Sequence, residues 1–258
     1  MAEWSGFYPC TCIAVDAEAY GGNNDLRQSE IQHDLPRLTS RAARNAGLDR
    51  ATWQIQRKGD EELVVHPMDG TEPRLVDDFV RHLVSELRGY NELRVPAARM
   101  RLRAAVHHGP VELADNGFAG STVVTTARLL SSRHLYDALA AHEGADLALL
   151  LSDDVYRSTV AGGHTTLTGG DFRRVVVDEK ECEAVAWLRV PGRDVRGPGD
   201  VLPDVELATR GRRPLADDHR DGGAMVRNDF RGGQNNVNNF NAPVDLRGGV
   251  VGFGSSGG

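Results

Sequence analysis

Short apolar segments alternate along the chain with longer amphipathic ones, and this pattern predicts most of its secondary structure. Apolar or alternating runs bounded by glycine, asparagine and aspartate predict strands. We expect these strands at residues 7–15, 52–56, 62–66, 101–107, around 111, 146–151, 173–177 and 183–189. Apolar residues at helical spacing predict helices over residues 25–46, bent at Pro36, over 75–87 and over 120–132, and a short capped helix at 152–154.

The order strand, helix, two strands, helix, strand indicates an α+β fold. It is the split βαβ pattern of ferredoxin-like antiparallel sheets, in which helices pack on one face. The periodicity stops near Pro191, so residues 5–191 are predicted to form one domain. Residues 192–225, rich in Arg, Asp, Gly and Pro, are interpreted as a flexible linker, and residues 226–258 as a low-complexity, Asn/Gly-rich tail.

Charge and composition narrow the range of partners. The net charge of −7 argues against a general nucleic-acid-binding protein, which needs a basic surface to displace counterions. The first residues lack the pattern of a signal peptide, and no apolar run is long enough to span a bilayer. Three cysteines form no disulfide framework, and Cys10 and Cys12 alternate as on a buried strand face. We therefore expect a cytoplasmic protein that binds neither nucleic acid nor membranes.

Two carboxylates stand at positions suited to a metal site. Asp16 follows the first predicted strand, and Asp60 lies in a hairpin turn after Gly59. In a ferredoxin-like sheet the first strand pairs beside that hairpin, so the two carboxylates are expected to converge. Two-metal chemistry on a triphosphate needs carboxylates held on rigid elements in this way. Taken singly, each aspartate is more typical of a turn or a helix cap.

Five motifs in unbroken order give a resemblance to a known family. Residues 13–17 (Ile-Ala-Val-Asp-Ala) and 58–61 (Lys-Gly-Asp-Glu) resemble the two metal motifs of class III adenylate and guanylate cyclases. Residues 101–109 resemble the next core strand of that family, residues 120–129 its glycine-led catalytic helix, and residues 175–180 its final hairpin. The match extends over about residues 7–190.

The resemblance implies a class III cyclase fold and a head-to-tail homodimer with active sites between the chains. Asp16, Asp60 and the backbone carbonyl of Ala17 would hold two Mg²⁺ or Mn²⁺ ions on a nucleoside triphosphate. Arg128 of the partner chain would stabilise charge on the α-phosphate, and Lys180 would contact the terminal phosphates. The products would be a 3′,5′-cyclic nucleotide and pyrophosphate. Without the surrounding motifs, Arg128 and Lys180 are typical of a solvated helix residue and an ordinary turn residue.

The chain departs from the family at the positions that orient the ribose and select the base. The family has an asparagine four residues before the arginine of its catalytic helix, where this chain has Val124, which cannot hydrogen-bond. Loss of one such donor costs on the order of tenfold to a thousandfold in rate. The base-selecting positions are Gln56 and Gly117, which match neither the adenine pair nor the guanine pair. Because glutamine both donates and accepts, adenine, guanine and a pyrimidine all stay open.

Three functions therefore stay open. The chain is an active cyclase in intracellular signalling, a nucleotide-binding sensor that has lost turnover, or a dimeric interaction module that signals through its tail. The spaced Asn, Val and Phe residues of the tail resemble bacterial amyloid signalling motifs, which would recruit an effector protein by templating. A flexible tail is the alternative, and Pro243 interrupts any long strand. His107 and His108 are adjacent on a strand and point to opposite faces, which predicts a structural role.

Overall fold

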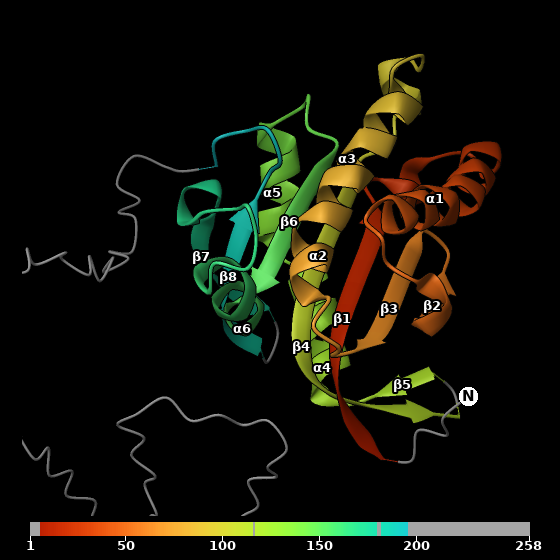
Figure 1. Ribbon diagram of the computed structural model, residues 1–258. Coiled ribbons are helices and arrows are strands. Elements are labelled where there is room, and N and C mark those ends of the chain that lie inside the picture. Colours follow the sequence, from red (N-terminus) through yellow and green to blue (C-terminus); the bar gives the residue numbers. More distant parts are fainter. Residues whose placement is uncertain (1–5, 116, 180–181, 196–258) are drawn as a thin grey trace, which may run out of the picture. The chain divides into compact units, whose positions relative to one another are not determined.

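The computed structural model describes residues 6–115, 117–179 and 182–195 of the chain (Figure 1). The predicted tail, the predicted linker beyond Val195, and Lys180 lie outside these residues. The structure therefore bears on the predicted domain and not on the segments that follow it.

The described strands form one mixed, mainly antiparallel sheet. Its order is β2-β3-β1-β4-β6-β8-β7, with β5 paired to β4. Within the described ranges, β4 and β6 are the one parallel pair. The strands are β1 Phe7–Ala17, β2 Gln54–Lys58, β3 Glu61–Pro67, β4 Leu102–Ala114, β5 Gly117–Ala119, β6 Leu147–Ser152, β7 Arg173–Glu179 and β8 Cys182–Arg189. Because β1 lies between β3 and β4, the end of β1 is flanked by a strand on each side.

Helices cover the sheet unequally. The α-helices are α1 Asp25–Asn45, α2 Glu72–Val76, α3 Asp78–Asn91, α4 Ser121–Leu130, α5 Arg133–Ala141 and α6 Asp153–Tyr156, which continues into a π-helical turn at Arg157–Ala161. The larger hydrophobic core lies between one face of the sheet and α1, α2, α3 and α6. A smaller core lies between the other face and α4 and α5. The predicted class, α+β with an antiparallel-dominated sheet and helices packed on one face, is confirmed, and α4 and α5 add a partial second cover.

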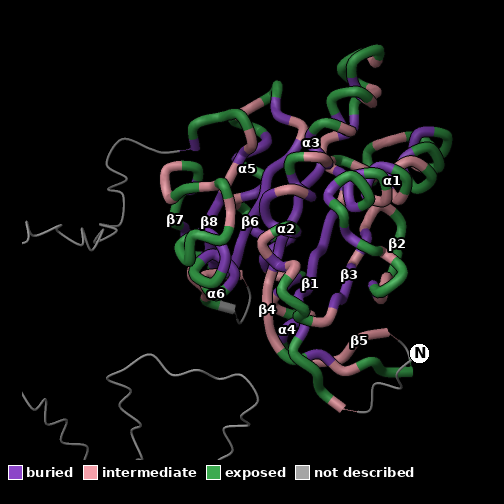
Figure 2. Tube along the Cα trace, in the orientation of Figure 1, coloured by how far each residue is buried: buried purple, intermediate pink, exposed green. Residues whose placement is uncertain are grey.

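Side-chain alternation along β1 separates the core from the candidate site. Ile13 and Val15 face the larger core, whereas Ala14 faces the smaller one. The same period of two places Asp16 on the face of Ala14. The central strands are buried over most of their length (Figure 2), and the six residues of β6 are all buried. An acidic side chain near the end of β1 therefore sits beside a dry sheet interior.

Several predicted elements differ from those in the structure. The predicted helix over residues 25–46 is confirmed as α1, which continues through Pro36 without a break. The predicted helix over 75–87 is divided into α2 and α3 at Asp77. The strands predicted at 101–107 and around 111 are one strand, β4. The helix α5 was not predicted, although Ser132 accepts a hydrogen bond from the backbone of His134 as a helix cap does.

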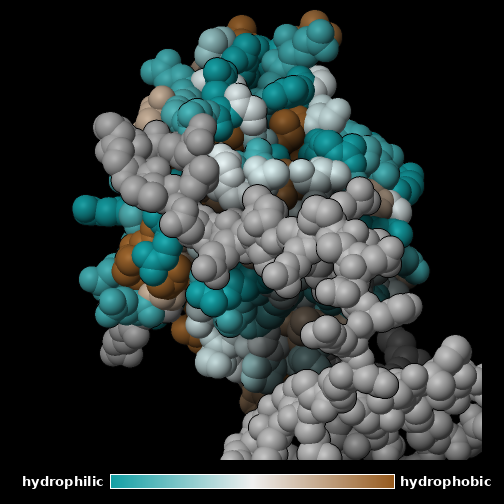
Figure 3. All heavy atoms as spheres, turned by 60° about the vertical axis from the view of Figure 1, so that its left-hand side comes forward, coloured by the Kyte–Doolittle hydropathy of each residue, from teal (hydrophilic) through white to brown (hydrophobic). Residues whose placement is uncertain are grey.

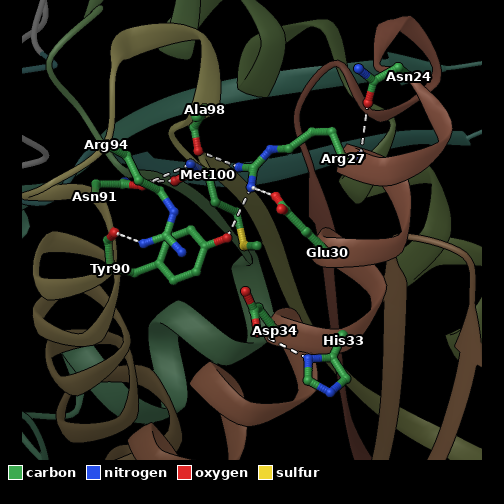
Figure 4. A network of polar contacts seen from close by, with 10 residues as sticks. All are labelled: Asn24, Arg27, Glu30, His33, Asp34, Tyr90, Asn91, Arg94, Ala98 and Met100. Atoms are coloured by element: carbon green, nitrogen blue, oxygen red, sulfur yellow. Dashed lines mark hydrogen bonds and ion pairs between the residues drawn. The ribbon is translucent and has the colours of Figure 1, made fainter.

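A polar network fixes the start of α1 against the end of α3 (Figure 4). The Asn24 side chain caps α1 by accepting from the backbone N–H of Arg27 at 2.9 Å. The largely buried Arg27 guanidinium donates to the Tyr90 hydroxyl at 3.0 Å and to the backbone carbonyl of Ala98. The Arg94 guanidinium lies over the Tyr90 ring, 3.5 Å from its centroid. The network anchors the segment that follows Asp16, because this segment runs directly into α1.

One face of the molecule is seen in Figure 3. On the face shown in Figure 3, the visible described residues are mostly hydrophilic, and hydrophobic residues appear in small separate groups. No described helix combines the length and apolar character needed to cross a bilayer.

Candidate active site

Strand pairing brings Asp16 and Asp60 together at the end of β1. Asp16 pairs with Glu61 on β3 and with Arg103 on β4. The backbone N–H of Ala17 donates to the backbone carbonyl of Asp60 at 3.3 Å. Gly59 precedes Asp60 with a φ of 62°, a conformation that favours glycine and permits the tight turn. The convergence predicted for the two aspartates is therefore present in the structure.

A buried ion pair joins Asp16 to Arg103. The Arg103 Nε donates to Asp16 Oδ1 at 2.9 Å, and Nη2 donates to Oδ2 at 2.6 Å. The Arg103 side chain is 7% exposed and the Asp16 side chain 15%, so water screens this contact little. Burial raises the pKa of Asp16 to about 7, although the charge and hydrogen bonds of Arg103 act to lower it. The nearby charges of Asp60 and Glu61 add to the increase.

Asp60 and Glu61 place two more carboxyl groups near Asp16, on its β3 side, whereas Arg103 lies on its β4 side. Both side chains are half-buried. Burial raises the pKa of each carboxyl, while Arg103 acts to lower that of Asp60 and Lys58 that of Glu61. Three carboxyl groups in a poorly solvated place repel one another, so a cation bound among them is favoured electrostatically.

One terminal nitrogen of the Arg103 guanidinium makes no hydrogen bond to any described residue. Nη1 is buried and has no hydrogen-bond partner among the described residues. The ring of Tyr136, on α5, covers the guanidinium with its centroid 3.8 Å from Cζ. Arg103 was not among the site residues predicted from the sequence. The signal was its position between Leu102 and Ala104, where a period of two places a charged residue on the same face as Asp16.

The oxygen atoms at this site suit a hard divalent cation. Carboxylates of Asp16 and Asp60 and the carbonyl of Ala17 are the kind of ligand that Mg²⁺ and Mn²⁺ take. Within the described part of the chain, no group of three or more His, Cys, Asp or Glu side chains forms a metal site on its own. Mg²⁺ is commonly bound by one or two carboxylates together with waters and substrate phosphates. The residues therefore fit cations that arrive with a nucleotide.

The two residues expected to face the base lie in contact. Gln56 is on β2 and Gly117 is on β5, at the start of the short strand paired with β4. A Cβ atom added to Gly117 would lie 2.9 Å from Gln56 Nε2, and the φ of Gly117 is 120°. Only glycine leaves room for the glutamine amide at this place. The structure thus brings Gln56 and Gly117 together, although they are far apart in sequence.

Val124 and Arg128 lie one helical turn apart on α4. Val124 is 54% exposed and Arg128 is half-buried, whereas Thr126 and Leu129 are buried against the sheet. Among the described residues, the side chain of Arg128 has no hydrogen-bond or ion-pair partner, although its backbone carbonyl accepts from the Ser131 hydroxyl. The two side chains therefore share the side of α4 that faces away from its own sheet.

The histidines on β4 behave as strand residues. His108 Nδ1 lies 3.0 Å from the Thr11 hydroxyl on β1. Burial lowers the pKa of both His107 and His108, so both favour the neutral ring. This arrangement agrees with the structural role predicted for the pair.

Comparisons with known proteins identify the fold. No protein-family model matches the chain, and no curated protein matches it. The structure of an adenylate/guanylate cyclase/hydrolase from Silicibacter pomeroyi matches with a TM-score of 0.53 and 18% sequence identity. The matched region covers 73% of this chain and 100% of the Silicibacter chain. A bacterial light-regulated adenylyl cyclase has a TM-score of 0.50 and 11% identity, covering 75% of this chain and 56% of its own. The chain therefore has the fold of an adenylate/guanylate cyclase catalytic domain, as the sequence resemblance implied.

Proposed function

We propose that this protein is a divalent-metal-dependent nucleotidyl cyclase that forms a 3′,5′-cyclic nucleotide and pyrophosphate in cytoplasmic signalling. The observation that carries the proposal is the meeting of Asp16, Asp60 and Arg103 at the end of β1. On one small surface it offers carboxylates for cations and a buried donor for an anion. A nucleoside triphosphate with its cations presents both charges.

Asp16, Asp60 and the Ala17 carbonyl are the groups that would hold two Mg²⁺ or Mn²⁺ ions. Bound there, the cations would lower the pKa of the ribose 3′-hydroxyl and neutralise the triphosphate. Both oxygens of Asp16 are engaged by Arg103 in the structure without nucleotide. Each oxygen has a second lone pair, so Asp16 would be able to hold a cation while it still accepts from Arg103.

Arg103 would gain a hydrogen-bond partner when a nucleoside triphosphate binds. Its Nη1 is a buried donor without an acceptor, and an unmade hydrogen bond of this kind is costly. An anionic phosphate oxygen satisfies that donor and keeps the guanidinium neutralised when Asp16 is shared. Arg103 would therefore bind the triphosphate in addition to orienting Asp16.

The outward side of α4 supports a role across a dimer interface. The Arg128 side chain has no partner in its own chain among the described residues and is one turn from the exposed Val124. In a head-to-tail homodimer this side would face the Asp16 site of the other chain, where Arg128 would stabilise charge on the α-phosphate. Lys180 is proposed to contact the terminal phosphates. Gln56 and Gly117 would line the place of the base.

One observation favours a second function. Val124 occupies the exposed position on α4 where the resemblance requires a hydrogen-bonding side chain for the ribose. The alternative is therefore a weakened cyclase homologue that binds nucleotide and signals as a dimer through its C-terminal tail to an effector protein.

Turnover and binding assays separate the two functions. Purified protein is incubated with each of the common nucleoside triphosphates and Mn²⁺, and pyrophosphate and cyclic nucleotide are quantified. A cyclase forms them in equal amounts, loses activity in Asp60→Asn, and keeps it in Asp25→Asn, an exposed aspartate on α1. Val124→Asn is expected to raise the rate at least about tenfold, because it supplies the missing donor.

Binding without product in the wild type, lost in Asp60→Asn, supports the sensor instead. If the wild type shows neither product nor metal-dependent nucleotide binding, both functions are wrong and only a dimeric interaction module is left. Calorimetric titration with a non-hydrolysable triphosphate analogue and Mn²⁺ measures this binding.

A further inference from the structure

The N-terminal end of α5 is fixed to the edge of the sheet. The backbone N–H of Arg133 donates to Glu179 Oε1 at 3.1 Å. His134 Nε2 donates to the backbone carbonyl of Val176 at 2.9 Å. Both acceptors belong to β7, the edge strand, so this end of α5 is held by side-chain and backbone contacts. Leu135 is completely buried beneath the helix.

The C-terminal end of α5 is tied to the segment that follows Asp16. Arg101 donates to the backbone carbonyls of Leu139 and His142 at the end of α5, and to that of Ala145 at 2.9 Å. Its Nη1 lies 3.1 Å from Glu18 Oε2. Cationic donors at a helix C-terminus satisfy carbonyls that the helix leaves unpaired. With both ends anchored, α5 has a fixed position beside the candidate site.

This fixed helix presents Tyr136 to Arg103. Tyr136 as a whole residue is 48% exposed, whereas Arg103 is 6% exposed, so the tyrosine lies on the solvent side of the guanidinium and covers it. Its centroid lies 3.8 Å from Cζ, within the range of a cation–π contact. With Tyr136 on one side, the guanidinium keeps the orientation in which Nε and Nη2 both reach Asp16.

We propose that Tyr136 is a positioning residue that holds the Arg103 guanidinium in place for Asp16 and for an anionic oxygen of a nucleoside triphosphate. The nucleotide part of this inference rests on the proposed function. Tyr136 acts through its aromatic face, so phenylalanine at this position is expected to keep the role and alanine to lose it. Contacts of this kind that are shielded from water change an affinity by about tenfold or more.

Nuclear magnetic resonance of the arginine Nε–H groups tests the positioning without any nucleotide. The full chain is labelled with ¹⁵N, and the Arg103 signal is assigned by its loss in Arg103→Met. We expect a signal that exchanges slowly with water in the wild type and in Tyr136→Phe. In Tyr136→Ala the exchange is expected to be at least about tenfold faster. Asp137→Ala, an exposed neighbour on α5, is the matched control and keeps the slow exchange.

Calorimetry of Mn²⁺-nucleotide binding tests the consequence. Tyr136→Ala is expected to bind about tenfold more weakly, with Tyr136→Phe and Asp137→Ala within about twofold of the wild type. If the Arg103 signal is unchanged in Tyr136→Ala, the positioning role is overturned. If the slow exchange is lost in Tyr136→Phe as well, the effect belongs to the tyrosine hydroxyl and the role of the ring is overturned. A faster-exchanging signal with unchanged affinity overturns the link to nucleotide. If the wild type binds no nucleotide, the proposed function fails, and the exchange rates still decide the role of Tyr136.

Discussion

Substitution of Arg103 by methionine removes the positive charge that pairs with the buried Asp16 carboxylate. Methionine keeps a long apolar side chain beneath the Tyr136 ring, so the packing changes less than the electrostatics. Asp16 loses both of its hydrogen bonds, at 2.9 and 2.6 Å, and stays beside Asp60 and Glu61. The substitution therefore leaves Asp16 among other acidic groups without a counter-charge, and it raises the pKa of Asp16 further.

The size of the effect follows from the burial of the pair. Removal of one partner of a buried ion pair costs about 3–5 kcal/mol, because the other charge is left without compensation. The Asp16 side chain is 15% exposed and is partly relieved by water, so we expect about 3 kcal/mol. For a folded unit of this size each 1 kcal/mol lowers Tm by roughly 2–4 °C, which gives a decrease of roughly 6–12 °C.

Divalent cations should restore part of this loss, since a cation held by Asp16 and Asp60 replaces the missing positive charge. A ligand at a hundred times its Kd stabilises the folded state by about 2.7 kcal/mol. Thermal unfolding followed by circular dichroism, with and without Mn²⁺, is the assay. We expect Mn²⁺ to stabilise Arg103→Met more than the wild type, because Arg103 no longer competes for Asp16. Nucleotide affinity should change in the opposite direction, since the Nη1 donor is gone.

Arg41→Met is the matched control. Arg41 pairs with Glu86 at 2.6 Å, but its side chain is 47% exposed, and such surface pairs contribute about 1 kcal/mol or less. If Arg103→Met lowers Tm no more than Arg41→Met does, the buried pair of Arg103 and Asp16 is not strongly coupled. Equal stabilisation of wild type and Arg103→Met by Mn²⁺ would refute the competition between guanidinium and cation.

Three further predictions concern packing, thiol reactivity and buried charge. Gly109→Ala places a Cβ 2.4 Å from Thr122 Oγ1, so α4 has to move from β4 and the free energy of unfolding falls by about 1–3 kcal/mol in denaturant titrations. Burial raises the pKa of Cys10 to about 11 and that of Cys12 to about 12, so neither thiol is alkylated by iodoacetamide at about pH 8.5 in the native protein, as judged by mass spectrometry. Glu62→Ala removes the 2%-exposed counterion of Arg50 and Arg57, whose side chains are 13% and 51% exposed, and lowers the free energy of unfolding by about 2–3 kcal/mol.

Each of these predictions has an internal comparison. Gly21→Ala meets no atom within 4 Å and should leave stability nearly unchanged, so an equal loss there would contradict the packing argument. Both cysteines should react once guanidinium unfolds the chain, and fast labelling of the native protein would show that they are accessible. Glu86→Ala removes a more exposed carboxylate and should cost far less than Glu62→Ala.

The sequence by itself determined the elements that carry the two aspartates. A strand ending at Asp16 depends on alternation within a few residues, and the turn at Asp60 depends on Gly59, which reaches its φ of 62° without strain. Both signals are local, so they survive without knowledge of the fold. The order of elements then indicated a sheet in which β1 pairs beside the hairpin, and the observed register agrees.

Only the tertiary structure decided what surrounds those aspartates. Asp16 and Arg103 are 87 positions apart, and their pairing depends on the register between β1 and β4. A shift of one residue would turn Arg103 to the opposite face, and no local pattern excludes that shift. The contact of Gln56 with Gly117 and the position of Tyr136 on α5 depend on packing in the same way. Local periodicity fixes which side chains stand at the ends of strands and in turns, whereas their charged and aromatic neighbours come from distant segments that meet only when the sheet is assembled.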